Sequence, residues 1–296
     1  MKELVTLLGE ENVRIKEEMS KHTTFRIGGP ADVYVKPPSQ QALIQTLVFC
    51  KERQIPCMVM GNGSNMLVSD AGIAGVVVST DALTRIEVNG GFVTAQSGAM
   101  LSKVASEALR HALSGLEFAA GIPGTIGGGV FMNAGAYGGE LKDVVTSVTA
   151  WNESGIQTFS AAECRFLYRS SIFQQNHFII LDVTMELSPG NPAEIESLIQ
   201  CYNSRRKEKQ PLEFPSAGST FKRPEGHFAG QLIEMAGLKG CRIGGAMVSE
   251  KHSGFVINAG GATAADVTAL VRHIKETVYE TSGVRLEEEI KVIGRI

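Results

Sequence analysis

The sequence has no CxxC motif, no metal-ligand motif and no hydrophobic run long enough to cross a membrane. Its five cysteines are odd in number and never form a CxxC pair, which favours reduced thiols in a cytoplasmic protein. The six histidines are scattered, with no HExxH motif, so we expect no metal site. No apolar run approaches the ~20 residues that span a bilayer. The N-terminus turns acidic before a signal-peptide core could form, so we expect no leader.

Two phosphate-binding motifs and a basic charge balance are also missing. There is no GK[ST] triplet, which excludes a Walker A loop. The Rossmann pattern fails because Met66, and not glycine or alanine, stands three positions after Gly63. A net charge of -3 argues against electrostatic binding of nucleic acid. With 296 residues, 43% of them hydrophobic, the chain suits two domains or one domain with an appended lobe.

Glycine is abundant, and eight of the 33 glycines lie between Gly121 and Gly139. Each glycine costs backbone entropy and buries no side chain, so we expect neither helix nor strand in this stretch. A flexible linker is the alternative, but linkers are rich in serine and charge, whereas this stretch is apolar. Its large apolar residues are Ile122, Ile126, Val130, Phe131 and Met132. We therefore expect its backbone to lie close against a phosphate or a cofactor ring.

A second glycine-rich loop, Gly61-Asn-Gly-Ser-Asn65, follows a predicted strand at 56–60. Successive backbone N–H groups of such a loop can converge on an anion, although most similar sequences are simple tight turns. Two separate glycine-rich loops would suit a long bipartite ligand such as a dinucleotide.

Periodicity and turn signals predict a mixed helix and strand protein. Helices are expected at 2–19 (one or two), 39–53, 101–112, 192–209, 227–236 and 263–282. Strands are expected at 56–60 and 75–79, paired in parallel, at 178–187, 255–258 and 290–293, and in hairpins at 85–97 and 144–159.

Three isolated polar residues have both a structural and a functional interpretation. Arg169 is a surface arginine or a fixed guanidinium that binds a carboxylate. Ser219 is a turn hydroxyl or a reacting group, though no GxSxG elbow surrounds it. Glu289 either belongs to a solvated start of a strand, or lies on the same strand face as Glu287 and next to the apolar run that follows. The basic cluster Arg205–Lys209 is explained by the dipole at a helix C-terminus.

Six motifs in one order resemble a known family. They are Gly61-Asn-Gly-Ser-Asn65, Ala120-Gly-Ile-Pro-Gly-Thr-Ile-Gly-Gly128, Asn133-Ala-Gly135, Tyr168-Arg169-x-Ser-Ile-Phe173, Ala217-Gly-Ser-Thr-Phe-Lys222 and Leu286-Glu-x-Glu289. Together they closely resemble the UDP-N-acetylenolpyruvoylglucosamine reductases, from about Thr23 to the C-terminus. One such motif alone would be weak evidence, but all six in register are highly specific.

The resemblance implies an α+β fold. Two subdomains of the vanillyl-alcohol-oxidase (PCMH-like) type, at 1–80 and 81–205, would hold FAD without a covalent link. A C-terminal α/β domain at 206–296 would bind substrate, and a return of the last strand to the N-terminal lobe is left open. The matched cofactor-binding residues are Gly61, Asn62, Gly63, Ser64, Asn65, Ala120, Gly121, Ile122, Pro123, Thr125, Gly127, Gly128, Asn133, Ala134 and Gly135.

The resemblance also implies a reaction. NADPH would reduce FAD, and flavin N5 would pass hydride to C3 of UDP-N-acetylglucosamine enolpyruvate, giving UDP-N-acetylmuramate for peptidoglycan. Arg169 and Glu289 match residues that stabilise the enolate-like intermediate, and Ser219 matches the acid that protonates C2. The matched substrate contacts are Tyr168, Lys209, Arg223 and His252. A cytoplasmic monomer is expected, with no nucleic-acid or membrane partner.

One departure from longer family members stands out. Phe173 runs through four residues straight into the strand at 178–187, which leaves no room for their substrate-closing tyrosine loop. The sequence therefore resembles the shorter, second type, as does Arg223-Pro-x-Gly-His-Phe-Ala-Gly230. Arg206, Lys209 and Arg223 are candidates to bind the diphosphate instead. The alternatives are another flavin oxidoreductase of this fold, or a nucleotide-sugar binding module without redox chemistry.

Overall fold

The computed structural model describes residues 2–295, which divide into two compact units along the chain. Unit 1 comprises Met1–Arg14, Tyr34–Asn62 and Val76–Arg206, and unit 2 comprises Ile15–Val33, Gly63–Gly75 and Lys207–Ile296. Each unit is described by itself below. The three-part division at residues 80 and 205 stays a prediction. Among residues 2–295, no helix combines the length and the apolar character needed to span a membrane.

The N-terminal segment is half helix and half strand. Helix α1 (Lys2–Leu8) ends at Gly9, whose φ of 86° is in the region that favours glycine, and a short 3-10 turn, η1 (Glu10–Asn12), follows. Residues Val13–Glu18 then form strand β1, with Ile15 64% exposed. The predicted second half of the N-terminal helix is therefore wrong, because the glycine ends the helix and β-branched Val13 and Ile15 suit a strand.

A helix and two parallel strands follow as expected. Helix α2 (Gln40–Glu52) begins after Ser39, whose hydroxyl accepts a hydrogen bond from the backbone N–H of Ala42. Strand β3 (Cys57–Met60) pairs in parallel with β5 (Ile73–Ser79), which confirms that prediction. They belong to a sheet of order β1-β2-β5-β3, in which β2 is Pro30–Val35.

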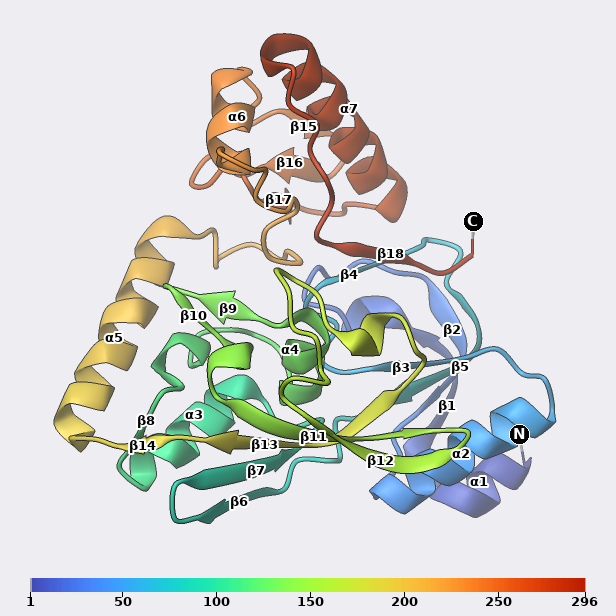
Figure 1. Cartoon of the computed structure of the whole chain (residues 1–296). Helices are drawn as coiled ribbons and strands as arrows, with labels where there is room; N and C mark the ends of the chain where they lie inside the picture. The colour runs from blue at the N-terminus through green and yellow to red at the C-terminus, as the bar shows by residue number, and fades with distance from the viewer. Residues whose placement is uncertain (1, 296) are drawn as a thin grey trace. The chain divides into compact units, whose positions relative to one another are not determined.

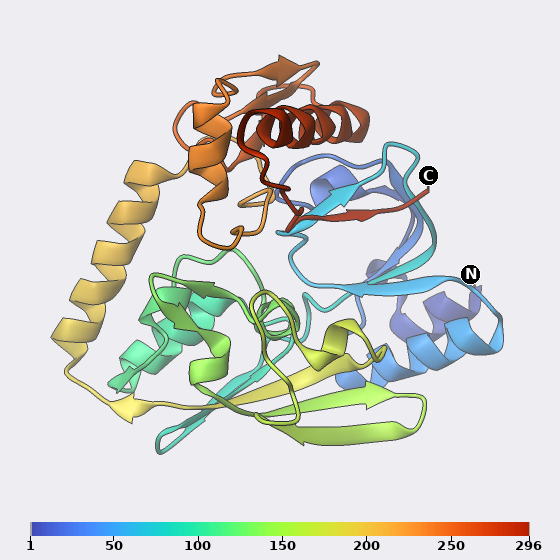
Figure 2. The same ribbon diagram turned by 45° about the horizontal axis from the view of Figure 1, so that its top comes forward.

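The large sheet of unit 1 has five antiparallel strands in the order β12-β11-β13-β7-β6. Both predicted hairpins are confirmed in it. Helices α3 (Leu101–Arg110) and α4 (Ile126–Met132) lie over one face of this sheet, and their apolar side chains fill the core between the layers (Figures 1 and 2). The strands are β6 (Ile86–Asn89), β7 (Phe92–Gln96), β11 (Val145–Asn152), β12 (Gly155–Ser160) and β13 (Ile179–Glu186).

Helix α4 and the short strand β9 (Gly135–Ala136) lie inside the glycine-rich stretch, so the expectation that this stretch would form neither helix nor strand is wrong. Thr125 caps it, with its hydroxyl accepting a hydrogen bond from Gly128 N–H. A Cβ on Gly127 would lie 2.8 Å from Ser97 Cβ, and one on Gly129 would lie 2.7 Å from Leu141 Cδ1. The glycines therefore let a short helix approach its neighbours closely, and this packing compensates for their low helix propensity.

Unit 2 contains a small antiparallel sheet, β15-β16-β17, with helix α7 packed on β15 and β16 and helix α6 beside α7 (Figure 1). The elements are β15 (Arg242–Ile243), β16 (Ala246–Val248), β17 (Val256–Asn258), α6 (Ala229–Met235) and α7 (Ala264–Ser282). Thr263 and Asp266 form a capping box at the start of α7. Asp70 accepts two further backbone hydrogen bonds there, from Ala264 and Ala265.

The last strand, β18 (Lys291–Ile293), pairs in parallel with β4 (Met66–Val68), more than 200 positions earlier along the chain. Helix α5 (Pro192–Lys209) begins at Pro192, as predicted. The remaining elements are two-residue strands, β8 (Leu113–Ser114), β9 (Gly135–Ala136), β10 (Gly139–Glu140) and β14 (Ser188–Pro189), and 3-10 turns η2 (Met19–Lys21), η3 (Glu117–Ala119), η4 (Leu141–Asp143) and η5 (Ile172–Gln174).

The packing of α4 predicts opposite effects at two adjacent glycines. Gly127→Ala places a methyl group against Ser97 and should lower the free energy of unfolding by about 1–3 kcal/mol. Gly128 is exposed and its Cβ would be 3.5 Å from the nearest atom, so Gly128→Ala should leave stability unchanged or raise it by up to about 1 kcal/mol. Urea unfolding of flavin-free protein measures both, and equal free energies would contradict the close packing.

Candidate functional site

Residues 61–62 of the first glycine-rich loop and residues 123–125 of the second lie in contact within unit 1. A Cβ on Gly61 would lie 2.3 Å from Thr125 Oγ1, so a side chain at residue 61 would collide with the cap of α4. Asn62 Nδ2 donates a 2.7 Å hydrogen bond to the carbonyl oxygen of Pro123. Residues 61–62 and 123–125 are therefore held in contact, although some 60 positions separate them along the chain.

The backbone N–H groups of the first loop have no acceptor. Within residues 2–295, none of the amides of Gly61–Asn65 donates a hydrogen bond, and Gly63 has a φ of 59°. At the start of α4, by contrast, Ile126 and Gly127 donate to the carbonyl oxygens of Ala99 and Ser97 at 2.7 and 2.9 Å. Consecutive free amides around a left-handed residue form an anion-binding nest, so the loop after β3 fits a pyrophosphate.

The other candidate cofactor residues shape this site with their backbones. Ala120, Ile122 and Ala134 pack against the core of unit 1. Asn133 is fully buried and left-handed (φ 43°), and its amide group donates to Glu140 Oε2 and to Leu167 O. Its side-chain oxygen accepts a hydrogen bond from Lys142 N–H. The Asn133 side chain therefore fixes the chain around Gly135 and has no donor left for a ligand.

Arg169 is held in place in unit 1 by several contacts. Its backbone is left-handed (φ 54°), and its carbonyl oxygen accepts a 3.0 Å hydrogen bond from Gln174. Its Nη2 donates to Gly135 O at 3.2 Å, and its guanidinium lies 5.3 Å from the ring centre of Tyr168, which is half exposed. This geometry favours a fixed guanidinium over a surface arginine, because a non-glycine residue keeps this backbone only where its surroundings hold it.

Arg206 is the residue whose environment the sequence did not reveal. Its Nη1 donates to Gly121 O, and burial lowers the pKa of its guanidinium. Tyr202, one turn earlier on α5, stacks on Tyr137 with ring centres 4.4 Å apart. The sequence did not indicate this contact, because Arg206 lies in a basic run at a helix C-terminus, where the helix dipole alone explains the positive charges.

The sequence did not indicate Ser97 either. Ser97 lies beside Gly127, and its buried hydroxyl has no partner among residues 2–295.

Unit 2 brings Ser219 and Glu289 onto neighbouring segments. Ser219 is exposed and follows Gly218, whose φ is 78°. The backbone N–H of Glu289 donates a 2.9 Å hydrogen bond to the carbonyl oxygen of Thr220, and Phe221 pairs with Glu288 in an antiparallel bridge. Asn65 Nδ2 also donates to the carbonyl oxygen of Glu289. Two residues 70 positions apart thus lie on paired backbones.

The candidate substrate contacts in unit 2 differ in their surroundings. Lys209 is exposed at the end of α5, and the guanidinium of Arg223 lies 4.0 Å from the ring centre of Phe228. His252 is partly buried, and its Nδ1 accepts a 3.1 Å hydrogen bond from Gly254 N–H. Burial lowers the pKa of the His252 ring, so the neutral imidazole is favoured.

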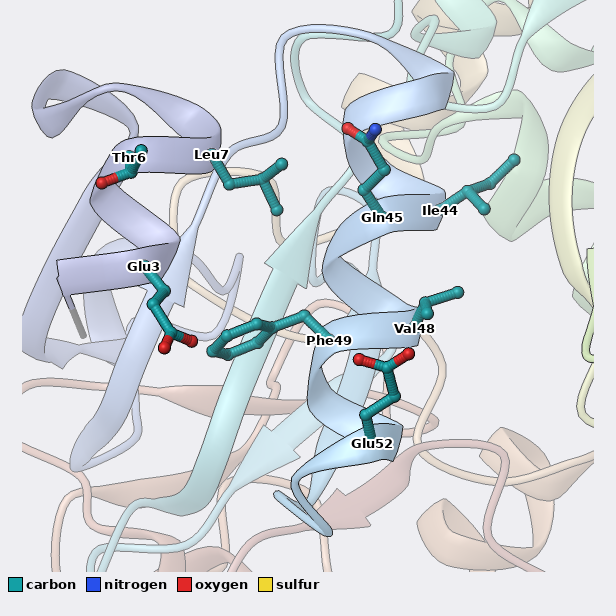
Figure 3. A pocket seen from close by; sticks show the side chains of 8 residues that line it. All are labelled: Glu3, Thr6, Leu7, Ile44, Gln45, Val48, Phe49 and Glu52. Carbon is teal, nitrogen blue, oxygen red and sulfur yellow. The ribbon is translucent and has the colours of Figure 1, made fainter.

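An open groove of about 570 Å³ lies elsewhere in unit 1, between α1 and α2 (Figure 3). None of the candidate site residues lines it. Phe49 points across the groove (Figure 3), and the guanidinium of Arg53 pairs with Glu3 and lies over the Phe49 ring. The lining residues are Glu3, Thr6, Leu7, Ile44, Gln45, Val48, Phe49 and Glu52. In the described part of the chain, no three His, Cys, Asp or Glu residues gather as a metal site would require.

Comparison with known proteins agrees with this geometry. Residues 31–160 match the FAD binding domain, and residues 210–293 match the C-terminal domain of UDP-N-acetylenolpyruvoylglucosamine reductase. The solved alkyldihydroxyacetonephosphate synthase shares the fold alone, with a TM-score of 0.52 and 14% identity over 64% of this chain and 40% of that one. The α+β fold of the vanillyl-alcohol-oxidase type is confirmed, and the chain is an FAD-containing oxidoreductase.

Full-length relatives narrow this class to one family. The UDP-N-acetylenolpyruvoylglucosamine reductases of Clostridium perfringens and Caldanaerobacter subterraneus are 50% and 51% identical, covering 99% and 98% of this chain and 98% and 97% of theirs. The crystal structure of the Thermus caldophilus reductase superimposes with a TM-score of 0.82 at 33% identity, over 95% of this chain and 99% of that one. The chain belongs to the UDP-N-acetylenolpyruvoylglucosamine reductase family.

The contact between the loops predicts an effect on flavin binding. Asn62→Ala removes the hydrogen bond to Pro123 and frees the loop after β3, so FAD should bind about 3–10-fold more weakly, as expected for one neutral hydrogen bond. Quenching of flavin fluorescence on titrating flavin-free protein measures this. Asn152→Ala, at the last residue of β11, is the matched control and should bind FAD normally. Unchanged affinity in Asn62→Ala would contradict the role of this contact.

The buried His252 predicts a pH-dependent contribution to stability. Its folded-state pKa lies below the unfolded value, so the unfolded chain binds the proton first as the pH falls. The contribution of the neutral ring is complete above about pH 6.5, the usual histidine pKa, and declines below it. The stability difference between wild type and His252→Asn should therefore shrink between pH 7.5 and pH 5.5 in urea unfolding. A constant difference would show that the ring is not held neutral.

Proposed function

We propose that the protein reduces UDP-N-acetylglucosamine enolpyruvate to UDP-N-acetylmuramate with NADPH, through bound FAD, in the cytoplasmic synthesis of peptidoglycan precursors. The observation that carries the proposal is that Ser219 and Glu289, motif residues 70 positions apart, lie on hydrogen-bonded backbones of one unit. The named reductases that match nearly the full chain support the same substrate.

The residues around the first glycine-rich loop fit FAD. The amides of Gly61–Asn65 would hold the pyrophosphate, and the backbone of residues 120–128 and 133–135 would form the wall against the ring system. Neither loop carries a histidine or cysteine, so binding without a covalent link is expected. When bound, the flavin would accept hydride from NADPH and deliver it to C3 of the enolpyruvyl ether.

The protein's own side chains would then stabilise the negative charge on the substrate and donate a proton to it. Addition of hydride at C3 leaves negative charge spread from C2 into the substrate carboxylate. The fixed guanidinium of Arg169 suits this charge, and Glu289, protonated or hydrogen-bonded, would assist it. Ser219 is exposed on its turn and would donate the proton to C2. A serine is a weak acid, so it acts only where the charged intermediate accepts its proton directly.

Tyr168, Lys209, Arg223 and His252 are proposed to contact the substrate. Tyr168 is half exposed beside Arg169, and Lys209 is exposed with its charge available. His252 is held neutral by burial, so it would act as a hydrogen-bonding group and not as a cation. The side chains of Lys209 and Arg223 would supply positive charge for the diphosphate.

An absorbance spectrum tests cofactor, donor and acceptor together. The purified protein should show flavin bands near ~450 nm that bleach with anaerobic NADPH and return when the enolpyruvyl nucleotide sugar is added. Bleaching without return would keep a flavin reductase but exclude this substrate. A flavin that NADPH does not bleach would favour the binding-module alternative.

Replacing the proposed acid should separate the two half-reactions. In Ser219→Ala, flavin reduction by NADPH should stay within about 2-fold of wild type, while reoxidation by substrate should slow by about 100-fold or more, the usual range of general acid catalysis. Stopped-flow absorbance measures both. Ser204→Ala, an exposed serine of α5, is the control and should match wild type. Equal loss of both half-reactions would remove Ser219 from the acid role.

A further inference from the structure

Thr220, the residue directly after Ser219, is 1% exposed and hydrogen-bonded on two sides. Its backbone N–H donates to Gly254 O, and its hydroxyl accepts a hydrogen bond from Val256 N–H, both at 2.9 Å. Its carbonyl oxygen accepts the 2.9 Å hydrogen bond from Glu289 N–H. Thr220 therefore joins the start of β17 to the segment that carries Glu289.

The turn before Thr220 is held on its other side by Ser216, which pairs with Ile257 in an antiparallel bridge, and by the buried side chain of Ala217. Gly218 is left-handed, and no atom lies within 4 Å of where its Cβ would stand. Ser219 itself is exposed. The backbone that carries Ser219 is therefore held from two sides, and Thr220 is the side that also bonds to the Glu289 segment.

The Thr220 hydroxyl is the side-chain group that accepts the hydrogen bond from β17, while Asn65 Nδ2 holds the same junction from another direction by donating to the carbonyl oxygen of Glu289. Val256 is 1% exposed, so its N–H has no water to replace the threonine oxygen. Losing the hydroxyl would leave that donor unpaired and loosen the tie to β17. The two backbone hydrogen bonds of Thr220 do not depend on the side chain.

We propose that Thr220 is a positioning residue for proton transfer: its hydroxyl fixes Ser219 relative to Glu289 by anchoring their shared backbone junction to β17. This inference rests on the proposed roles of Ser219 and Glu289. Displacing a reacting group by about 1 Å can slow a reaction by about 100-fold, so a loosened junction should be visible in the rate.

The test compares two substitutions in the FAD-bound enzyme. Thr220→Val keeps the size and branching but removes the hydroxyl, and substrate should reoxidise its reduced flavin at least 10-fold more slowly than in wild type. Thr220→Ser keeps the hydroxyl and should recover to within 3-fold of wild type. Flavin reduction by NADPH should stay within 2-fold in both. Thr220→Ala is a second hydroxyl-free variant, for use if Thr220→Val does not fold.

A double variant distinguishes positioning from general loosening. If Thr220 acts through Ser219, adding Thr220→Val to Ser219→Ala should slow reoxidation by less than 2-fold more. Thr263→Val is the matched control, since it also removes a hydroxyl that accepts one backbone hydrogen bond, from Asp266 in the cap of α7. Its reoxidation rate should equal that of wild type.

Three results would overturn the inference: a wild-type rate in Thr220→Val, multiplying losses in the double variant, or an equal loss in Thr263→Val. Failure of the proposed function looks different, because substrate would then not reoxidise the wild-type flavin at all.

Discussion

The close approach of two loops is the constraint on which the rest of unit 1 depends. Gly61 lies so near Thr125 that a Cβ would collide with the hydroxyl that caps α4, and Asn62 bonds to Pro123 across the same contact. The contact holds Asn62 in the loop after β3, whose backbone amides donate no hydrogen bond within residues 2–295. Helix α4 then starts at a fixed point and packs through Gly127 and Gly129 against the core.

Candidate site residues fall into two kinds once their contacts are known. In some, the side chain is used inside the protein and only the backbone is left for a ligand: Ile122 packs against the core, and the Asn133 side chain hydrogen-bonds to Leu167 and Lys142. Others present a side chain on a held backbone, as Arg169 does in its left-handed conformation. Sequence motifs contain both kinds of residue, because replacing a residue of either kind would damage the site. The distinction matters for mutagenesis, since replacing the first kind alters shape and replacing the second alters chemistry.

In unit 2, as in unit 1, a buried core supports the segments that carry the candidate site residues. Its core lies between α7 and the small sheet, and α7 begins at a capping box reinforced by Asp70. The turn with Ser219 and the segment with Glu289 are exposed or partly exposed, but they are hydrogen-bonded to each other through Thr220, which also bonds to β17. Reactive residues on surface segments that a buried scaffold positions are the common arrangement in enzymes.

The sequence alone determined the local elements and the chemical inventory. Ser39, Asn89-Gly90 and Pro192 act through neighbours within a few residues, so the two helices and the hairpin that they mark formed as predicted. Six motifs in register were enough to indicate the family. Only the tertiary structure decided that the glycine stretch contains a helix and that Arg206 bonds to Gly121. Both depend on partners outside the local sequence, whose contacts outweigh the local propensity of glycine or of a helix end.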